Sequence, residues 1–332
     1  MSSVLVTGGA GFIGSHLAEA LVRRGHSIVV LDDLSGGFAD NLPSTIVLTR
    51  GSILDVELLN RLFVEHAFDY VYHLAAYAAE GLSHFIKRFN YTNNVVGSVN
   101  LINAAVNFNV KGFVFTSSIA VYGDGGGRPM DEATRPHPQD SYGIAKFAVE
   151  QELGACRDMF GLDYIIFRPH NVYGPKQNIG DRYRNVVGIF MNQILQGKPM
   201  TIFGDGTQTR AFSYIDDVVP AMAEAIEKPD AWNQIFNIGA DQPYALNDLA
   251  RRVAGVMNVE PAIVYLPARH EVHHAHSTHQ KVRQVFGRQR ETSLEDGLRT
   301  MAAWVRTRGA RSSTPFQEIE VPKNLPAVWL EA

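Results

Sequence analysis

The sequence has almost no cysteine and no long apolar run. Cys156 is the single cysteine among 332 residues, which excludes an internal disulfide and fits a reducing compartment. No stretch approaches the roughly 18 uninterrupted apolar residues of a membrane span. The N-terminus has no basic segment followed by an apolar run, the pattern of a signal peptide. We therefore expect a cytoplasmic protein without a membrane span.

A strong excess of one charge is also missing. The chain has 30 Lys and Arg against 34 Asp and Glu, so its formal net charge is −4 at pH 7. This balance gives no support for a nucleic acid or an anionic membrane as partner. Hydrophobic residues make up 45% and charged residues 19%, as in ordinary globular proteins. The length suits one large or two small domains.

One short motif suggests a metal enzyme. Residues 270–274 read H-E-V-H-H, the zinc-peptidase motif, which binds zinc only when it lies on a helix. Residues 262–266 are β-branched and aromatic and predict a strand. Ser277 and Gln280 form a predicted capping box for a helix over 281–286. The motif is therefore expected to be extended; we predict no metal site, and a zinc peptidase remains a remote alternative.

The first half of the chain alternates strand-like and helix-like segments. Strands are predicted at residues 4–6, 27–31, 45–49, 69–74, 112–116 and 164–167, and helices at residues 12–24, 56–66, 83–107 and 141–160. This βαβα rhythm predicts an α/β fold, a Rossmann-type doubly wound parallel sheet with helices on both faces.

The rhythm loosens after Pro169, and the charged turn 180–184 predicts a boundary. The first domain is expected to span residues 1–170, with 211–240 returning to it through strands at 211–215 and 234–238. Residues 171–210 and 241–310 are expected to form a smaller mixed α/β C-terminal substrate domain. Residues 311–332 are expected to be an irregular tail on the surface.

A glycine-rich turn follows the first predicted strand. Gly9, Gly11 and Gly14 satisfy G-x-G-x-x-G, and Gly8 begins an overlapping glycine pattern. Glycines let the backbone approach a pyrophosphate, which then lies at the helix N-terminus. Asp32 ends the next strand, where a carboxylate bonds the ribose hydroxyls and repels a 2′-phosphate. The sequence therefore predicts NAD rather than NADP.

A serine, a tyrosine and a lysine follow at informative positions. Ser118 comes directly after the fifth predicted strand, at the sheet edge where ligands bind in open parallel sheets. Tyr142 and Lys146 are four residues apart on a predicted helix and therefore share one face. A nearby ammonium favours the phenolate form of a tyrosine, so the pair could work as an acid and base.

Six segments together resemble the extended short-chain dehydrogenase/reductase family, and within it the NDP-sugar epimerases of the UDP-glucose 4-epimerase type. They are VTGGAGFIG, HLAA, TSSIAVYG, SYGIAK, RPHNVYGP and FGDGTQTRAFSYIDDV. The resemblance covers the chain to about residue 308. It implies a tightly bound NAD that is not consumed, a UDP-sugar substrate, and a homodimer formed through the helices near 83–107 and 141–160.

The resemblance also implies residue roles. Tyr142 would be the acid/base, Lys146 would bind the nicotinamide ribose, and Ser118 would bridge to the sugar hydroxyl. The implied cofactor-binding residues are Gly8, Gly11, Phe12, Ile13, Gly14, Asp32, Asp33, Ser52, Ile53, Leu74, Ala75, Ala76, Asn94, Tyr142, Lys146 and Pro169. The implied substrate-binding residues are Ser118, Tyr142, Asn171, Asn185, Ile202, Phe203, Arg210, Arg269 and Glu271. Arg269 and Glu271 thus make the H-E-x-x-H segment part of a nucleotide-sugar pocket.

The expected reaction is epimerisation at carbon 4 through a transient 4-keto sugar. Relatives that dehydrate or decarboxylate resemble one another in carrying an acid near position 120, where this chain has Ile119 and Ala120. The substrate is expected to be UDP-glucose/UDP-galactose or the N-acetylhexosamine pair, since Ala275 matches a gate position. UDP-glucuronate is an alternative, weakened by Asn178 where such relatives carry Arg. Another NDP-sugar epimerase or dehydratase reaction of the family is a further alternative.

Overall fold

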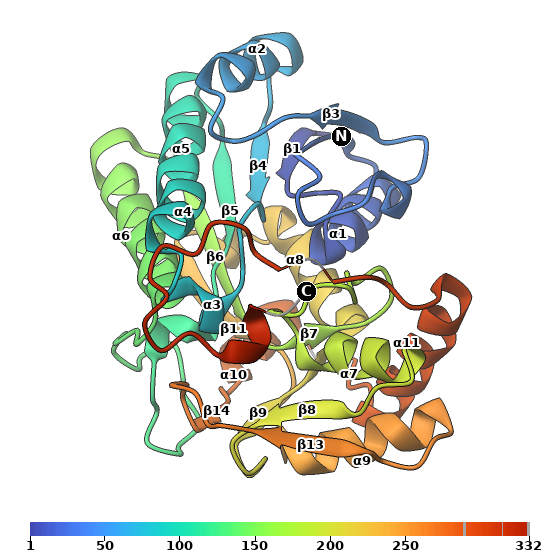
Figure 1. Cartoon of the computed structure of the whole chain (residues 1–332). Coiled ribbons are helices and arrows are strands. Elements are labelled where there is room, and N and C mark those ends of the chain that lie inside the picture. Colours follow the sequence, from blue (N-terminus) through green and yellow to red (C-terminus); the bar gives the residue numbers. More distant parts are fainter. Residues whose placement is uncertain (288–289, 314, 331–332) are drawn as a thin grey trace.

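A central sheet of seven parallel strands organises the protein. The structure, a computed structural model, describes residues 1–287, 290–313 and 315–330. The strands are β1 (Ser3–Thr7), β2 (Ser27–Asp32), β3 (Val47–Arg50), β4 (Tyr70–His73), β5 (Gly112–Thr116), β6 (Tyr164–Pro169) and β11 (Gln234–Ile238). Their order, β11-β6-β5-β4-β1-β2-β3, is that of a Rossmann-type doubly wound sheet and confirms the predicted fold class (Figure 1).

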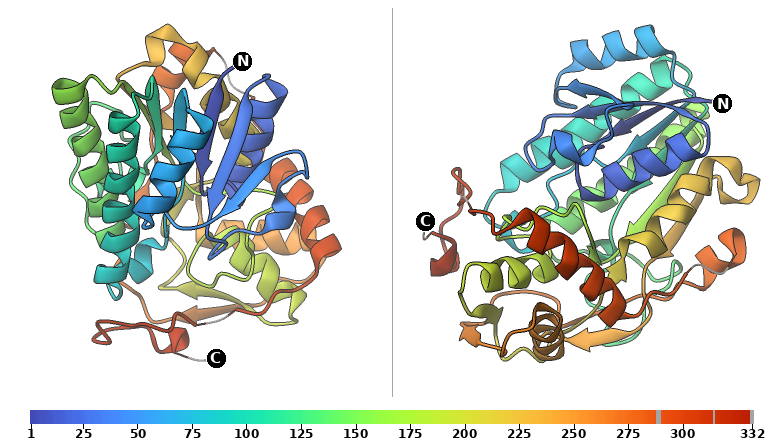
Figure 2. Two further views of the ribbon diagram at one scale, coloured as in Figure 1. Left: turned by 90° about the horizontal axis from the view of Figure 1, so that it is seen from above. Right: turned by 90° about the vertical axis from the view of Figure 1, so that its right-hand side faces the viewer.

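Helices cover both faces of this sheet, as Figure 2 shows. The helices α2 (Val56–His66), α5 (Gly97–Asn107) and α6 (Ser141–Phe160) pack on one face through an apolar cluster that includes Leu59, Leu101 and Leu153. On the other face, α1 (Phe12–Arg23) packs against β1 and β2, and α8 (Ile215–Glu224) lies beside α1, where Met222 O accepts a hydrogen bond from Tyr72 Oη of β4 at 2.9 Å. Both faces of the strands are therefore buried, which explains their nearly continuous apolar sequences.

Local sequence accounts for the helix boundaries. Asp55 precedes α2, and its Oδ1 accepts a hydrogen bond from Leu58 N at 2.9 Å. Asp140 caps α6 in the same way, accepting from Gly143 N at 2.8 Å. Such caps satisfy backbone N–H groups that have no partner within the helix. Gly161 ends α6 in the left-handed conformation with φ of 74°.

The single helix predicted over residues 83–107 is divided in the structure. It consists of α3 (Glu80–Ser83), α4 (Lys87–Tyr91), a π-helical turn over Thr92–Val96 and then α5. Asn93 donates through Nδ2 to Phe89 O at 2.9 Å within this turn. Side-chain bonds of this kind compete with the backbone ladder, and π-turns gather near functional sites.

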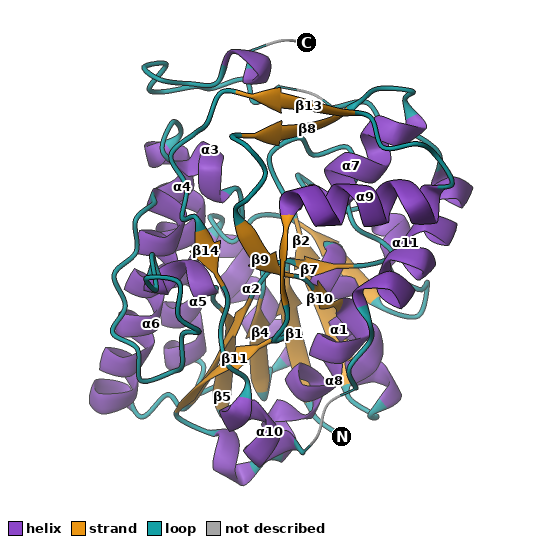
Figure 3. Ribbon diagram, turned by 90° about the horizontal axis from the view of Figure 1, so that it is seen from below, coloured by secondary structure: helices purple, strands orange, loops and turns teal. Residues whose placement is uncertain are grey.

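The smaller part of the molecule lies beyond the carboxyl ends of the main strands. Its elements are β7 (Val172–Tyr173), α7 (Val186–Leu195), β8 (Met200–Phe203), β9 (Thr209–Ala211), β10 (Ser213–Tyr214), β12 (Pro243–Ala245), α9 (Leu246–Met257), β13 (Ile263–Leu266), β14 (His274–Ala275) and α11 (Leu294–Arg308). The helix α10 (Gln280–Phe286) instead packs against the main sheet, where Phe286 contacts Phe236 of β11. Figure 3 shows the paired strands β8 and β13 at the end of the molecule away from the main sheet.

The two strands expected to return to the first sheet behave differently. β11 does join it, beside β6, but the predicted strand 211–215 does not. β9 ends at Ala211 and pairs with β12 and β14, while β10 pairs with β7 and Ile215 begins α8. Because β5 and β11 already occupy both edges of β6, no position next to β6 is open to residues 211–215.

The H-E-x-x-H segment is extended, as predicted. Residues 270–273 have no regular secondary structure and residues 274–275 form β14, so the two outer histidines of the motif share no helix face. The predicted capping box, however, is wrong. α10 begins at Gln280 after His279, without a side-chain cap, and the Ser277 hydroxyl contacts the His279 ring instead.

The described part of the C-terminal tail is largely irregular, and specific contacts fix it to the rest of the protein. Trp329 is only 4% exposed and packs with Leu82 and Ile86. Glu320 accepts hydrogen bonds from the backbone N–H groups of Arg88 and Phe89 at 2.7 and 2.9 Å. The tail thus packs through apolar contacts and specific hydrogen bonds. Among the described residues, no helix is long and apolar enough to cross a membrane.

Candidate active site

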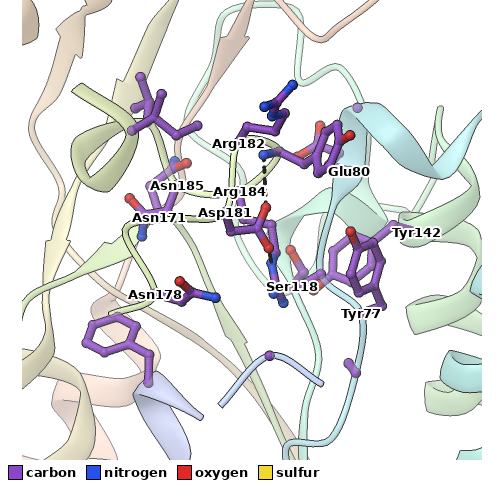
Figure 4. Close-up of a pocket in the computed structure, with 18 of the residues that line it drawn as sticks. Tyr77, Glu80, Ser118, Tyr142, Asn171, Asn178, Asp181, Arg182, Arg184 and Asn185 are labelled. Atoms are coloured by element: carbon purple, nitrogen blue, oxygen red, sulfur yellow. Dashed lines mark hydrogen bonds and ion pairs between the residues drawn. The ribbon is translucent and has the colours of Figure 1, made fainter. Parts of the chain in front are cut away.

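A large cavity opens at the carboxyl ends of the main strands. Its volume is about 810 Å³, and it extends from the glycine turn after β1 to β8 and the C-terminal tail. Open α/β sheets bind ligands at this edge. Figure 4 shows Ser118, Tyr142 and Tyr77 on one side of the cavity and Asn171, Asn178 and Asn185 on the other.

The glycine turn is shaped for close approach of a ligand backbone. Gly8 has φ of +70°, and a Cβ there would lie 2.6 Å from Ala75 N. A Cβ on Gly14 would lie 2.2 Å from the carbonyl oxygen of Gly8. Side chains at these positions would therefore displace backbone, so glycine is required by the geometry. The resulting cradle at the start of α1 fits a dinucleotide pyrophosphate.

Asp32 supports the turn and faces the same cavity. Its Oδ2 accepts from Ala10 N at 2.9 Å and its Oδ1 from Leu34 N at 2.8 Å. Burial raises the pKa of the Asp32 carboxyl, while the bonds from Leu34 and Ala10 lower it. A carboxylate at the end of β2 fits the ribose hydroxyls of NAD, so the glycine turn and Asp32 together fit this cofactor.

Ser118, Tyr142 and Lys146 meet at the cavity from two elements. Ser118 follows β5, and its Oγ accepts from Ala120 N at 3.1 Å, which holds the short 3₁₀ turn Ile119–Tyr122. Tyr142 and Lys146 come from the first turns of α6, with the Lys146 Nζ 5.8 Å from the centre of the Tyr142 ring. Lys146 Nζ donates to Thr116 O at 2.8 Å. A backbone carbonyl thus helps to orient the ammonium.

The electrostatics of this group depend mainly on burial. Burial raises the pKa of Tyr142, a hydrogen bond with Ser118 lowers it, and the carboxylates of Asp140 and Glu80 raise it. Burial lowers the pKa of Lys146 to about 7, although Glu150 raises it. Burial thus acts against the charged forms of both groups, the phenolate of Tyr142 and the ammonium of Lys146.

Two asparagines line the opposite side of the cavity. Asn171 and Asn185 have φ of 39° and 59°, in the left-handed region that asparagine tolerates. The Asn185 side chain donates to Val172 O, and its Oδ1 is buried without a hydrogen-bond partner among the described residues. A buried acceptor of this kind is satisfied when a donor enters the cavity.

Arg269 and Glu271 form a pair at the far end of the cavity. Arg269 donates through Nε and Nη2 to Glu271 Oε2 at 3.1 and 2.8 Å. Arg210 lies nearby, but its Nη1 and Nη2 donate to the backbone carbonyls of Thr209, His273 and Val272. Arg210 therefore stabilises the 272–273 backbone in this structure. Among the described residues, no group of three His, Cys, Asp or Glu could hold a metal ion.

All of the predicted site residues except Asn94 line this one cavity. Asn94 is buried behind it, because its side-chain amide bonds both the N–H and the carbonyl of Tyr77 at 2.8 and 3.0 Å. Its neighbour Asn93 faces the cavity instead. Asn94 therefore supports the backbone of Tyr77, which is itself on the cavity side.

Several cavity residues were missed at the level of sequence. The charged turn 180–184, interpreted as a domain boundary, lies on the cavity wall, where Arg184 Nε bonds Asp181 Oδ2 at 2.6 Å (Figure 4). Arg184 also lies 5.0 Å from the ring centre of Tyr77. Trp329 of the C-terminal tail is a further cavity residue that was not predicted. The cluster of two Arg, one Asp and one Tyr in five residues was the available signal for the turn.

A family model for the NAD dependent epimerase/dehydratase family matches residues 4–239. The chain belongs to this family. The match includes the glycine turn, Ser118, Tyr142 and Lys146, whereas Arg269 and Glu271 lie beyond it. The enzyme is accordingly NAD-dependent, in agreement with the fit of the glycine turn and Asp32.

Individual relatives agree with this assignment over nearly the whole length. A UDP-glucose 4-epimerase of Mycolicibacterium smegmatis is 35% identical over 301 residues, which is 89% of this chain and 95% of the relative. The crystal structure of a UDP-glucose 4-epimerase with UDP-glucose from Thermotoga maritima has a TM-score of 0.88 and 36% identity, covering 92% of this chain and 99% of its own. A UDP-glucuronic acid 4-epimerase from Bacillus cereus, in complex with UDP-glucuronic acid and NAD, has a TM-score of 0.84 and 29% identity over 92% and 99%.

Proposed function

We propose that this enzyme epimerises a UDP-sugar at carbon 4 and uses NAD without consuming it. The observation that carries the proposal is that Ser118, Tyr142 and Lys146 meet in one cavity with the glycine turn and Asp32. The two similar crystal structures, one with UDP-glucose and one with UDP-glucuronic acid and NAD, support the same chemistry.

The residues divide the work of a reversible hydride transfer. NAD, when bound, supplies the acceptor and later the donor of the carbon 4 hydride. Tyr142 takes the proton of the 4-hydroxyl and returns it after the 4-keto sugar has presented its other face. Ser118, which hydrogen-bonds Tyr142, helps to hold the 4-hydroxyl of the sugar. Lys146 Nζ lies 5.8 Å from the centre of the Tyr142 ring, and its ammonium would favour the phenolate that accepts this proton.

We assign the two ends of the cavity to two different molecules, NAD and the nucleotide sugar. We assign NAD to the wall formed by Phe12, Ile13, Asp33, Ser52, Ile53, Leu74, Ala75, Ala76 and Pro169, with the glycines and Asp32. We assign the nucleotide sugar to Asn171, Asn185, Ile202, Phe203, Arg210, Arg269 and Glu271. This corresponds to a division into an NAD-binding domain, residues 1–170 with the β11 strand, and a nucleotide-sugar domain, residues 171–210 and 241–310.

The sugar is assigned to the UDP-glucose/UDP-galactose or the N-acetylhexosamine pair. Ala275 lines the cavity and leaves space that a larger side chain would fill, which favours an N-acetyl group. UDP-glucuronate is the alternative within the same reaction, because Arg182 and Arg184 also line the cavity and guanidinium groups bind carboxylates.

A related NDP-sugar reaction is the second candidate. Ile119 and Ala120 line the cavity without an acidic group, but Glu80 places a carboxylate on its wall and affects the pKa of Tyr142. An additional acid near the sugar is what an elimination would need. A dehydrated product would favour this candidate over simple epimerisation.

We further propose a cytoplasmic homodimer formed through α5 and α6. Large apolar side chains are exposed on or next to these neighbouring helices, at Val96, Phe108, Ile144, Met159 and Phe160. The free, buried Cys156 agrees with a reducing compartment. A monomeric mass by light scattering would contradict the dimer.

The activity is tested by incubating the purified enzyme, without added NAD, with UDP-glucose, UDP-N-acetylglucosamine or UDP-glucuronate. Chromatography of the products should show the 4-epimer of at least one substrate at equilibrium. Tyr142→Phe protein, prepared in parallel, should give none above background. Absence of a 4-epimer from every substrate in the presence of bound NAD would contradict the proposed function.

A further inference from the structure

The C-terminal residues 311–313 and 315–330, here named the C-terminal strap, form part of the substrate cavity. Ser313, Val328 and Trp329 line it together with the residues assigned to the nucleotide sugar. The strap lies beyond residues 4–239, which match the family model. In Figure 1 it is the red segment that leaves α11 and crosses the front of the molecule.

The start of the strap is fixed to the smaller part of the molecule. At its start, Asn192 Nδ2 and Gln196 Nε2 of the α7 region donate to Arg311 O at 2.9 and 2.8 Å, and Arg182 Nε donates to Ser313 Oγ at 3.0 Å. These residues belong to the smaller part of the molecule, beside the cavity.

The middle of the strap is held by the Rossmann part. Glu320 accepts from the N–H groups of Arg88 and Phe89, and its own N–H donates to Phe85 O at 2.8 Å. Phe316 packs edge-on against the Phe89 ring, with centroids 4.9 Å apart. The strap therefore bridges both sides of the cavity before its last residues enter it.

Trp329 at the end of the strap lies against Arg269. The Arg269 guanidinium carbon is 4.6 Å from the Phe203 ring centre and 5.6 Å from that of Trp329. Trp329 also contacts Phe203 and Tyr183, with ring centroids 5.9 and 5.4 Å apart. Two aromatic rings and the Glu271 carboxylate thus limit the positions that the Arg269 guanidinium can take.

We propose that Trp329 is a positioning residue that holds Arg269 in place for the diphosphate of a nucleotide substrate, and that the strap anchored by Glu320 keeps Trp329 there. This rests on the proposed function, which assigns Arg269 to the nucleotide sugar. A guanidinium already oriented loses less freedom when it binds a diphosphate, so affinity for the nucleotide increases. Trp329 has no part in the chemical step proposed for Ser118 and Tyr142. Its replacement should therefore change substrate binding rather than turnover.

The test is the affinity of the NAD-containing enzyme for UDP, measured by isothermal titration calorimetry with wild type, Trp329→Ala, Trp329→Phe and Leu330→Ala. Leu330 is the matched control, because it is the adjacent large apolar residue and is exposed. Trp329→Ala should weaken UDP binding about 10-fold, since a cation–aromatic contact contributes on this order. Trp329→Phe should recover most of the loss, and Leu330→Ala should behave as wild type.

Kinetics with the substrate that the enzyme converts provide the second readout. Trp329→Ala should raise KM with kcat within about twofold, because uniform binding is lost while the transition-state contacts remain. Glu320→Ala should raise KM in the same direction with every cavity side chain intact, and Glu320→Gln should do so less. The inference would be overturned if Trp329→Ala bound UDP as tightly as wild type. It would also be overturned if this variant lost its bound NAD, or if its kcat fell by as large a factor as its KM rose.

These outcomes separate the inference from the proposed function. If wild type binds no UDP, the assignment of Arg269 to a nucleotide fails, and with it the function on which the inference rests. If wild type binds UDP and converts a UDP-sugar but Trp329→Ala is unchanged in both, only the role of the strap is rejected. UDP binding does not require turnover, so this decision does not depend on knowing the sugar.

Discussion

At the scale of single residues, the three proposed catalytic residues could be located from sequence, and the residues that support the cavity could not. Ser118, Tyr142 and Lys146 could be found because each belongs to a short motif next to a predicted strand end or helix start. Asn94 could not be assigned correctly, because its amide bonds the backbone of Tyr77, seventeen positions away in sequence. Such a contact leaves no local pattern.

Tyr142→Phe removes the proposed acid/base and leaves the ring. Because proton transfer by a positioned group contributes about 10²- to 10⁴-fold, kcat should fall by at least about 10²-fold. Bound NAD, measured after heat release, should remain, since the phenol is one contact among many at the cofactor. Activity within about threefold of wild type would reject Tyr142 as the acid/base.

Glu150 is a buried residue behind the cavity and is bonded to Ser117 of the cavity wall. Its carboxylate accepts from Arg168 Nε at 2.9 Å and from Ser117 Oγ at 2.5 Å, and both Glu150 and Arg168 are buried. Removing one partner of a buried pair leaves an uncompensated charge and costs about 3–5 kcal/mol. Glu150→Ala should lose about this much unfolding free energy in urea, whereas Glu152→Ala, two residues on and exposed, should stay within about 0.5 kcal/mol. Equal stability of the two variants would contradict this account of the pair.

At the scale of elements, periodicity and capping predicted most strands and helices of the first half. These signals failed where side chains bond to the helix backbone, or where an element pairs with a segment distant in sequence. The π-helical turn over Thr92–Val96 interrupts a segment with uniform helical spacing, and Ser277 bonds His279 instead of capping α10. Strand 211–215 was misplaced because its pairing depends on which edges of β6 other strands already occupy.

The turn between β1 and α1 gives a prediction at this scale. Gly14→Ala would put a methyl group 2.2 Å from the Gly8 carbonyl oxygen, so the turn must shift. The variant should be purified with little bound NAD and low activity. Gly154→Ala, in the interior of α6 with no atom within 4 Å of the added Cβ, is the control. It should keep NAD and gain about 0.5–1 kcal/mol of stability. Full retention of NAD by Gly14→Ala would contradict the role given to the turn.

At the scale of the whole molecule, the doubly wound sheet was predictable and the closure of the cavity was not. The βαβα order fixes the sheet and the edge at which ligands bind. The charged turn 180–184 and the C-terminal strap reach that edge only through the tertiary fold. Trp329 lies 60 residues after Arg269, and nothing in its Pro-interrupted surroundings predicts their contact.

Stability of the whole molecule should fall in mild acid. Burial lowers the pKa of His73 and of His170 to about 3, from an ordinary value of 6.5. Below pH 6.5 the unfolded chain gains protons at these positions and the folded chain does not, so folding loses free energy as the pH falls toward 3. Urea denaturation should give a lower midpoint at pH 5.5 than at pH 7.5. A midpoint independent of pH over this range would contradict the buried neutral state of the two histidines.

Proton NMR of the reaction in D₂O, with purified enzyme and no added NAD, tests the central claim most directly. UDP-glucose, UDP-N-acetylglucosamine and UDP-glucuronate are supplied separately, and the ring protons are followed to equilibrium. The account predicts a 4-epimer that keeps protium at carbon 4, because the hydride leaves and returns without exchange with solvent. Deuterium in the ring, or a dehydrated or decarboxylated product, would contradict epimerisation by hydride transfer at carbon 4.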